Sequence, residues 1–362
     1  MTSKFGNKIS IEITGGSHTE CMEAVLRGFP KGVKIDEENI AAQMKRRSPG
    51  QDKSATPRQE KDEVEILSGV QNGVTNGEDI KIVIKSETQR SRDYDEFKVT
   101  PRPNHADYPA LVKTGGECDL RGGGHFSGRL TAPLTALGAI CREYLKTRGI
   151  YVGGHIFNIG ECFDTAFDPV TVNKEQLEKL NGLYFATNNL DAANDMKTAI
   201  ENARQDNDSI GGTVEIAVVG MPVGIGQHMF GGVENLISSV VFGVSAVKGV
   251  SFGAGFDFAY LLGSEANDAY YYRDDKVVTA TNNCGGIVGG MTTGMPIIIK
   301  AALKPTPSIA KPQSTVNLNT KENVMLTIGG RHDPCIVPRA LPAIEAAVAI
   351  AVTMLLAEDN AV

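Results

Sequence analysis

Alternating and helically spaced hydrophobic positions divide the chain into strands and helices. Residues 8–14 alternate isoleucine with polar residues, which is typical of a strand with one buried face. After Asp36, apolar residues recur at helical spacing as far as Arg47, so we expect Asp36 to cap a helix that ends there. The same reasoning predicts strands at 64–70, 80–84 and 213–219, and helices at 131–148, 191–205, 234–247 and 342–357.

The last of these helices is apolar almost throughout, because residues 346–357 carry no charge. We therefore expect it to be buried on most sides. The strands outnumber what a regular strand–helix alternation would supply, which favours an α+β fold over a doubly wound parallel sheet. No low-complexity linker or shift in composition marks a boundary, so residues 1–362 are expected to form a single domain.

Composition narrows the class of protein further. The 362 residues include 43 acidic and 36 basic side chains, a net charge of −7, and an acidic chain lacks the field that non-specific nucleic-acid binding needs. Six cysteines are scattered without a CxxC pair, which argues against a disulfide scaffold or zinc ribbon. No apolar run resembles a membrane span or an export signal. We expect a cytoplasmic globular protein with no membrane or nucleic-acid partner.

Polar loops punctuated by glycine or proline are the candidates for chemistry. In the first, residues 14–20, a glycine pair would let the backbone approach a ligand, and His18 would act as a general acid. The alternative is an exposed loop histidine. The second has five cations within residues 45–58, a cluster suited to phosphate or carboxylate. A solvated helix end would explain Arg46 and Arg47 but not Lys53 or Arg58.

Two further segments combine glycine, proline and charge. Three consecutive glycines at 122–124 precede a predicted helix, which would expose backbone N–H groups to an anion. They are not a GxGxxG motif, and a simple chain reversal is the alternative. The fourth segment joins 304–308 with 329–335. Asp333 there would act as an acid or base, or as an N-cap, and the absence of an HExxH pattern argues against a metal site.

Taken together, these loops hold histidines and cations but no nucleophile motif such as G-x-S-x-G. They suit a small, strongly anionic ligand to which histidines transfer protons.

At these residues the sequence resembles the chorismate synthase family. The shared motifs follow the family's order over nearly the whole chain. They are Gly16-Ser17-His18, Arg46-Arg47-x-Pro49-Gly50, Ile66-Leu67-Ser68-Gly69-Val70, Gln89-Arg90-Ser91, Arg102-Pro103-x-His105-Ala106-Asp107-Tyr108, Arg121-Gly122-Gly123-Gly124 with Ser127 and Arg129, Ala246-Val247-Lys248-Gly249-Val250, Gly285-Gly286-Ile287-x-Gly289-Gly290, Lys304-Pro305-Thr306 and Gly330-Arg331-His332-Asp333-Pro334-Cys335.

The resemblance implies a lyase of aromatic amino-acid biosynthesis. It would convert 5-enolpyruvylshikimate 3-phosphate to chorismate by 1,4-anti elimination of phosphate. It would require reduced FMN without net redox change, with NADPH a candidate reductant. The implied fold is a single α+β domain with helices sandwiched between antiparallel β-sheets, assembled as a homotetramer.

The resemblance also assigns roles to individual residues. His18 would protonate the departing phosphate, His105 would lie beside the flavin's pyrimidine edge, and Asp333 would relay the substrate proton. Substrate contacts are expected from Arg47, Arg58, Ser127 and Arg129. Cofactor contacts are expected from Arg47 and Lys53 toward NADPH, and toward the flavin from His125, Phe126, Ser127, Ser245, Ala246, Gly289, Lys304, Pro305, Thr306, Pro307, Ser308 and Arg331.

The sequence departs from the family pattern at several of these loops. Gly16 replaces the usual Glu and Thr19 the usual Gly, which alters the shape and charge of the first loop. Lys53 replaces Arg, which keeps the charge and loses the bidentate fork. Ser48 replaces a frequent third Arg, and His125-Phe126 replaces the frequent Arg-Ser, removing a cation near the flavin. His18, His105 and Asp333 are retained, so activity is expected.

Two other functions compete with this interpretation. A flavin reductase on the same scaffold is disfavoured because the chain has no long insertion. A protein that binds anions or RNA through residues 45–58 is disfavoured by the net charge of −7 and by the scarcity of aromatic residues around that segment.

Overall fold

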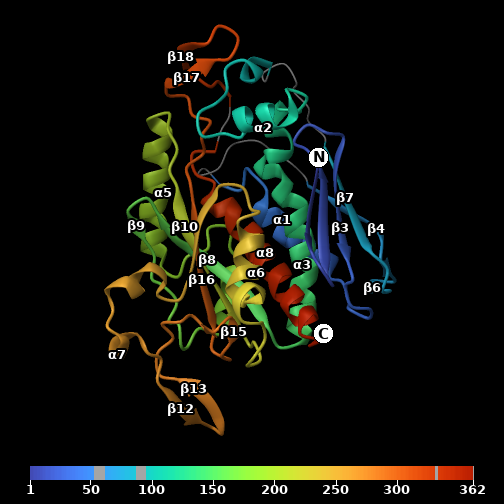
Figure 1. Cartoon of the computed structure of the whole chain (residues 1–362), viewed down its shortest axis with the longest axis vertical. Coiled ribbons are helices and arrows are strands. Elements are labelled where there is room, and N and C mark those ends of the chain that lie inside the picture. Colours follow the sequence, from blue (N-terminus) through green and yellow to red (C-terminus); the bar gives the residue numbers. More distant parts are fainter. Residues whose placement is uncertain (53–61, 87–94, 331–332, 362) are drawn as a thin grey trace.

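Two five-stranded antiparallel sheets enclose a layer of helices in the computed structural model, which describes residues 1–52, 62–86, 95–330 and 333–361 (Figure 1). The first sheet has the order β1 (Thr2–Gly6), β2 (Ser10–Gly15), β3 (Cys21–Arg27), β7 (Ile80–Lys85) and β4 (Val64–Ser68). The second has the order β11 (Val247–Phe252), β16 (Ile297–Leu303), β10 (Gly212–Val219), β8 (Tyr151–Ile159) and β9 (Cys162–Phe163). Every pair of neighbouring strands in both sheets is antiparallel.

The helix layer consists of α1 (Glu37–Arg47), α3 (Thr131–Thr147), α6 (Val233–Val241) and α8 (Val337–Glu358). Helix α3 contacts β3 and β7 of the first sheet, and α8 contacts β8 and β10 of the second. Gly138 sets the crossing of α3 and α8, because a Cβ there would lie 2.2 Å from the Cβ of Ala346. The core is therefore continuous from one sheet to the other through the helices.

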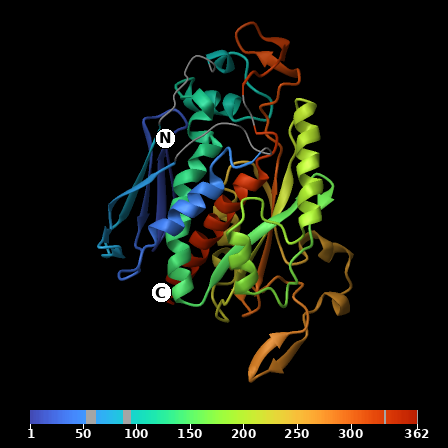
Figure 2. The same ribbon diagram turned by 180° about the vertical axis from the view of Figure 1, so that it is seen from behind.

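Two more helices, α4 (Lys174–Asn181) and α5 (Leu190–Gln205), cover the other face of the second sheet (Figure 2). Two adjacent glycines of β8 show that different helices pack against the two faces of this sheet. A Cβ on Gly153 would meet Leu177 of α4, and one on Gly154 would approach Leu341 of α8. The shorter elements are β5 (Val70–Gln71), β6 (Val74–Thr75), β12 (Tyr270–Arg273), β13 (Lys276–Thr279), β14 (Ile287–Val288), β15 (Met291–Thr292), β17 (Gln313–Asn317), β18 (Glu322–Leu326), α2 (Asp107–Thr114), α7 (Gly263–Ala266) and the 3-10 turns η1 (Asp95–Lys98), η2 (Arg121–Phe126), η3 (Gly128–Leu130), η4 (Met229–Gly231) and η5 (Gly255–Tyr260).

The α+β class with helices between antiparallel sheets is confirmed, and most predicted elements occur within one to three residues of their expected ends. The helix predicted at 234–247 is wrong in its second half. Helix α6 ends at Val241, residues 242–246 form a turn in which Ala246 has φ 74°, and Val247 begins β11 by pairing with Leu303. Valine at 240, 244 and 247 fits a helical stripe, but pairing with β16 determines the structure of the last residues.

Helix α8 is buried on all sides, as its sequence predicts. Within the described part of the chain it alone has the length and composition of a membrane span, and its whole apolar window is buried inside the protein. It is therefore the central helix of the core. Its one acidic residue before the C-terminal turn, Glu345, has a fully buried side chain.

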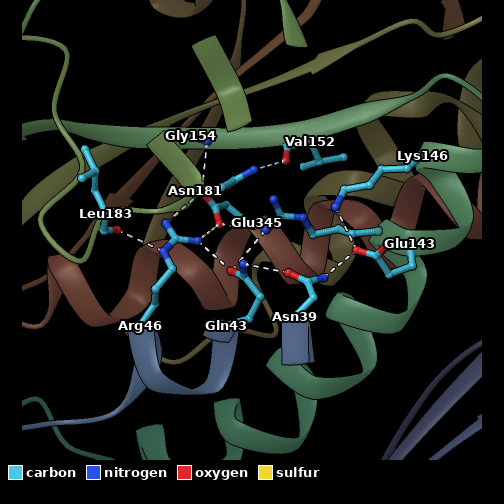
Figure 3. A network of polar contacts seen from close by, with 11 residues as sticks. Asn39, Gln43, Arg46, Glu143, Lys146, Val152, Gly154, Asn181, Leu183 and Glu345 are labelled. Carbon is cyan, nitrogen blue, oxygen red and sulfur yellow. Dashed lines mark hydrogen bonds and ion pairs between the residues drawn. The ribbon is translucent and has the colours of Figure 1, made fainter. Parts of the chain in front are cut away.

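Glu345 is compensated by two arginines from the neighbouring helices (Figure 3). Its Oε2 pairs with Nη1 of Arg46 at 2.6 Å and with Nη1 of Arg142 at 3.3 Å, and its Oε1 accepts the Gly154 N–H at 3.0 Å. Gln43 Oε1 accepts from Nη1 of both arginines. The network joins α1, α3, α8 and β8. It also corrects the expectation for Arg46, which lies in the core and not in an anion-binding loop.

We expect Glu345→Gln to destabilise the protein, because it leaves two buried guanidinium groups without their carboxylate. Removing one partner of a buried ion pair typically costs about 3–5 kcal/mol. The thermal midpoint and the urea midpoint should both fall. Glu12→Gln is the control, because Glu12 pairs with Arg27 at the surface and should change stability by less than about 1 kcal/mol. Equal midpoints for the two variants would contradict the prediction.

A second buried charge cluster lies on β8, on the face of the second sheet that packs against α4 and α5. His155 donates from Nδ1 to Asp164 at 2.7 Å and from Nε2 to Glu215 at 2.9 Å. Both donations require a doubly protonated ring. Burial alone would lower the pKa of His155, but the hydrogen bonds and charges of the two carboxylates outweigh it and raise that pKa above 6.5. The pKa of Asp164 is correspondingly lowered despite its burial.

This cluster makes stability depend on pH. The raised pKa of His155 contributes stability that is complete below pH 6.5 and is lost as pH rises through the folded value. The lowered pKa of Asp164 contributes stability above pH 3.8 that is lost only as pH falls through its own folded value. We expect His155→Gln to lower the thermal midpoint most below pH 6.5 and progressively less as pH rises. A difference that is constant from pH 5 to 9 would contradict this.

Candidate active site

A cavity of about 900 Å³ lies where the C-terminal end of α1 meets the N-terminal ends of α3 and α8. Loops from both sheets complete its wall. Most of the predicted site residues line it, although they are spread from residue 18 to residue 333. They are His18, Arg47, His105, His125, Phe126, Ser127, Arg129, Ser245, Ala246, Lys304, Thr306, Pro307, Ser308 and Asp333.

Several predicted residues are not brought to this cavity or are not described. Pro305 does not line it although its neighbours do. Gly289 lies in the turn between β14 and β15, away from the lining. Lys53, Arg58 and Arg331 lie outside the described residues. Among the residues that are described, no group of three or more His, Cys, Asp or Glu side chains is placed to hold a metal ion.

His18 is held against the glycine run in the loop that follows β2. It is 5% exposed, and the neighbouring Ser17 N–H donates to Gly124 O at 3.0 Å. Gly122 has φ 57°, and a Cβ there would lie 2.3 Å from Cε1 of His18. Glycine at 122 is therefore required both by its backbone conformation and by the imidazole. Thr19 closes the same loop, since its Oγ1 accepts from Gly16 N–H at 2.9 Å and donates to Cys21 O, at the start of β3, at 2.7 Å.

His105 belongs to a buried cluster at the start of α2. Asp107 is fully buried, and its Oδ2 and Oδ1 accept from Nε and Nη2 of Arg102 at 2.7 and 2.8 Å. Its Oδ1 also lies 2.7 Å from Nδ1 of His105. Burial would raise the pKa of Asp107, but hydrogen bonds from Arg102 and His105 outweigh it and hold that pKa well below 3.8. A permanent carboxylate thus orients the Nδ1–H of His105.

The opposite nitrogen of His105 faces the glycine run. A Cβ on Gly123 would lie 3.5 Å from Nε2 of His105 and 3.4 Å from the Cβ of Ser127. Because Nδ1 of His105 faces the Asp107 carboxylate, Nε2 is the atom that His105 presents to the cavity. Sequence reasoning missed Asp107 and Arg102 as partners, although both belong to the same motif as His105.

His125 uses both ring nitrogens within the protein. Its Nδ1 lies 2.8 Å from Gly15 O, so it donates there, and its Nε2 accepts from Ser3 Oγ at 2.8 Å. These bonds tie η2 to β1 and β2. A neutral ring in this position offers a ligand its face and not a nitrogen. Phe126 follows it at the cavity wall and is 36% exposed.

Two arginines on one wall share a carboxylate that sequence reasoning missed. Asp62 Oδ2 accepts from Nη1 of Arg47 at 2.6 Å, and Asp62 Oδ1 pairs with Nη1 of Arg129 at 3.0 Å. All three side chains are at least nine-tenths buried. Arg47 also donates to Thr131 Oγ1 and Gly128 O, which fixes it against the start of α3. Asp62 stands beside the predicted basic segment, but no spacing rule pairs it with either arginine.

Lysines add positive charge on another wall. Lys304 donates to Asn104 O. Burial and the neighbouring charge of Lys248, which sequence reasoning did not include, lower the pKa of Lys304. A bound anion would stabilise the charged form of Lys304 against its burial and against the repulsion from Lys248, so this wall favours anionic groups.

Asp333 is fixed by a further residue that sequence reasoning missed. Nη1 of Arg339, in the first turn of α8, donates to Asp333 Oδ2, and its Nε donates to Arg47 O at 3.2 Å. Asp333 and Arg339 both line the cavity. A charge-paired carboxylate at this position can exchange a proton with a ligand without moving.

Comparisons with known proteins agree with this geometry. The model of the chorismate synthase family matches residues 9–356. A chorismate synthase of Methanobrevibacter smithii is 42% identical over 350 residues, 97% of this chain and 95% of its own. One of Thermococcus kodakarensis is also 42% identical, over 96% of this chain and 95% of its own. A crystal structure of a chorismate synthase aligns with a TM-score of 0.76 and 27% identity over 98% of this chain and 93% of the other. The chain therefore belongs to the chorismate synthase family, a family of lyases that form chorismate in the shikimate pathway.

Proposed function

We propose that the cavity binds 5-enolpyruvylshikimate 3-phosphate together with reduced FMN and eliminates phosphate by the 1,4-anti route. One observation carries this proposal. His18, His105 and Asp333 line the same cavity as four cations, Arg47, Arg129, Lys248 and Lys304. Substrate and cofactor are both polyanions, which explains why an acidic protein collects cations at this place.

The residues present fit a flavin phosphate. A cavity of about 900 Å³ lies near the upper end of the ~300–1,000 Å³ typical of ligand sites, so it has room for two ligands. Thr306 Oγ1 is buried with no hydrogen-bond partner among the described residues. With Lys304 and Ser308 it would hold the cofactor, and Phe126, Ser245 and Ala246 would contact it. Reduced FMN would supply electron density to the allylic system as the bond to phosphate breaks.

His18 is proposed to give its proton to the departing phosphate. Its imidazole is buried in the cavity wall, where proton transfer does not compete with bulk water. The pKa of Asp119 is lowered mainly by its hydrogen bond from Arg121 and least by the charge of His18. Once the phosphate carries the proton, Arg47 and Arg129 would still balance its remaining charge.

Asp333 is proposed to take part in removal of the substrate proton. Arg339 holds its carboxylate from the N-terminal turn of α8. His105 lies in the loop before α2, with Nε2 facing the glycine run, and would accept a proton at Nε2 from the cofactor's polar edge. The acid, the base and the orienting histidine thus come from three separate loops.

The proposal also covers assembly and the reductant. Large apolar side chains including Phe230, Phe256, Tyr260 and Tyr272 are at least 79% exposed, which supports a homo-oligomer such as the expected homotetramer. NADPH as reductant and a cytoplasmic location stay predictions.

The activity test is direct. Purified protein is incubated anaerobically with photoreduced FMN and 5-enolpyruvylshikimate 3-phosphate, and chorismate is followed by its ultraviolet absorbance. Chorismate and phosphate should appear in equal amounts without consumption of reduced flavin. His18→Ala and Asp333→Asn should each lower kcat by about 10²-fold or more. His228→Ala, an exposed histidine outside the cavity, is the control. Net oxidation of NADPH without chorismate would favour the reductase alternative.

Asp107→Asn tests the orientation of His105. Because the pKa of Asp107 is held well below 3.8, the carboxylate stays ionised at neutral pH. Asparagine can donate to Nδ1 and so favours the wrong tautomer. We expect kcat to fall about 10- to 100-fold across pH 6–8, with the substrate KM changed less.

The control for this variant is Asp208→Asn, which removes a carboxylate paired with Lys311 at the surface. Circular dichroism and thermal midpoints establish that both variants are folded. A folded Asp107→Asn enzyme with unchanged kcat would refute the orienting role.

A further inference from the structure

The carboxylate of Asp62 occupies an unusual position between the two cavity arginines. It bridges Nη1 of Arg47 and Nη1 of Arg129 at 2.6 and 3.0 Å, and its side chain is fully buried. Asp62 itself is not among the residues that line the cavity, whereas both arginines are. It therefore acts on the cavity through them.

The physical need for this carboxylate follows from charge. Two buried guanidinium groups on one wall repel each other, and each loses hydration on burial. A carboxylate placed between them offsets the repulsion, accepts a hydrogen bond from Arg47 and forms an ion pair with Arg129. These three side chains together carry a charge of +1, which favours an anion.

The same chain contains a comparable cluster that has no access to the cavity. Glu345 is buried beside Arg46 (Figure 3) and Arg142. Its Oε2 lies 2.6 Å from Nη1 of Arg46 and 3.3 Å from Nη1 of Arg142. Arg46 and Arg47 are adjacent, so neighbouring residues of α1 supply one arginine to each cluster. None of Arg46, Arg142 and Glu345 lines the cavity. Each cluster consists of one buried carboxylate and two arginines, and the clusters differ in whether the arginines line the cavity.

We propose that Asp62 is a positioning residue for substrate binding, which holds Arg47 and Arg129 at the separation that the substrate's anionic groups require. This rests on the proposed function, in which the two arginines contact the substrate. Helix α1 supplies Arg47, the turn before α3 supplies Arg129, and Asp62 precedes β4. Asp62 thus sets the spacing between two independent elements.

The test is Asp62→Asn, with steady-state kinetics and with calorimetric titration of 5-enolpyruvylshikimate 3-phosphate into flavin-free enzyme. The KM and the dissociation constant should both rise at least tenfold, while kcat falls less than threefold. Glu345→Gln is the matched control, because it removes the same charge from the core cluster. It should lower the thermal midpoint and leave KM within twofold of wild type.

A conservative variant covers the case in which Asp62→Asn does not fold. Asp62→Glu keeps the charge and adds one methylene, so it should fold and shift the arginines. We expect a KM three- to tenfold above wild type at an unchanged thermal midpoint. A KM equal to wild type in a folded Asp62→Asn or Asp62→Glu enzyme would overturn the proposal. Tighter substrate binding by Asp62→Asn would also overturn it, since the carboxylate would then be a competing anion.

Two further variants, Arg47→Gln and Arg129→Gln, distinguish failure of the proposed function from failure of the positioning role of Asp62. If neither arginine variant raises KM or weakens binding, the arginines do not contact the substrate and the proposed function fails at this wall. If both do and Asp62→Asn does not, the arginine roles stand and the positioning role of Asp62 is wrong.

Discussion

The structure depends on burying one carboxylate, Glu345, at the centre of the helix that both sheets enclose. Helix α8 is apolar enough to pack in many rotational settings, so dispersion and hydrophobic burial alone would fix its orientation weakly. The ion pairs with Arg46 and Arg142 and the Gly154 N–H fix it against α1, α3 and β8 at once. The same helices end at the cavity, so this network supports the frame of the site without lining it.

Helical geometry lets the same segment serve the core and the site. Successive residues of an α-helix differ by about 100° in direction, so Arg46 and Arg47 at the end of α1 point to different neighbours. Arg46 reaches α8 and Leu183 O, whereas Arg47 reaches Asp62 and the start of α3. Arg46 therefore serves the packing of the core, and Arg47 serves the cavity wall.

The periodicity of the sequence predicts β2, α1, α3, α5 and α8, because burial of one face decides those elements locally. It does not predict the end of α6, where pairing of Val247 with β16 decides. In the site, the loop histidines and cations are recognisable by residue type and motif. Their partners Asp62 and Arg339 are not, because nothing local relates them to Arg47 or Asp333. For the same reason sequence alone cannot tell which of the adjacent residues Arg46 and Arg47 faces the core and which lines the cavity.

The cavity divides its cations into two kinds. Its arginines are paired with carboxylates, as Arg102 with Asp107 and Arg339 with Asp333 show, so each adds direction and little net charge. Lys248 and Lys304 have no carboxylate partner within the described residues, and burial with mutual repulsion lowers the pKa of Lys304. An arriving polyanion relieves that repulsion, so attraction comes mainly from the lysines. Orientation comes from the arginines, because a paired guanidinium keeps its place whether or not a ligand is bound.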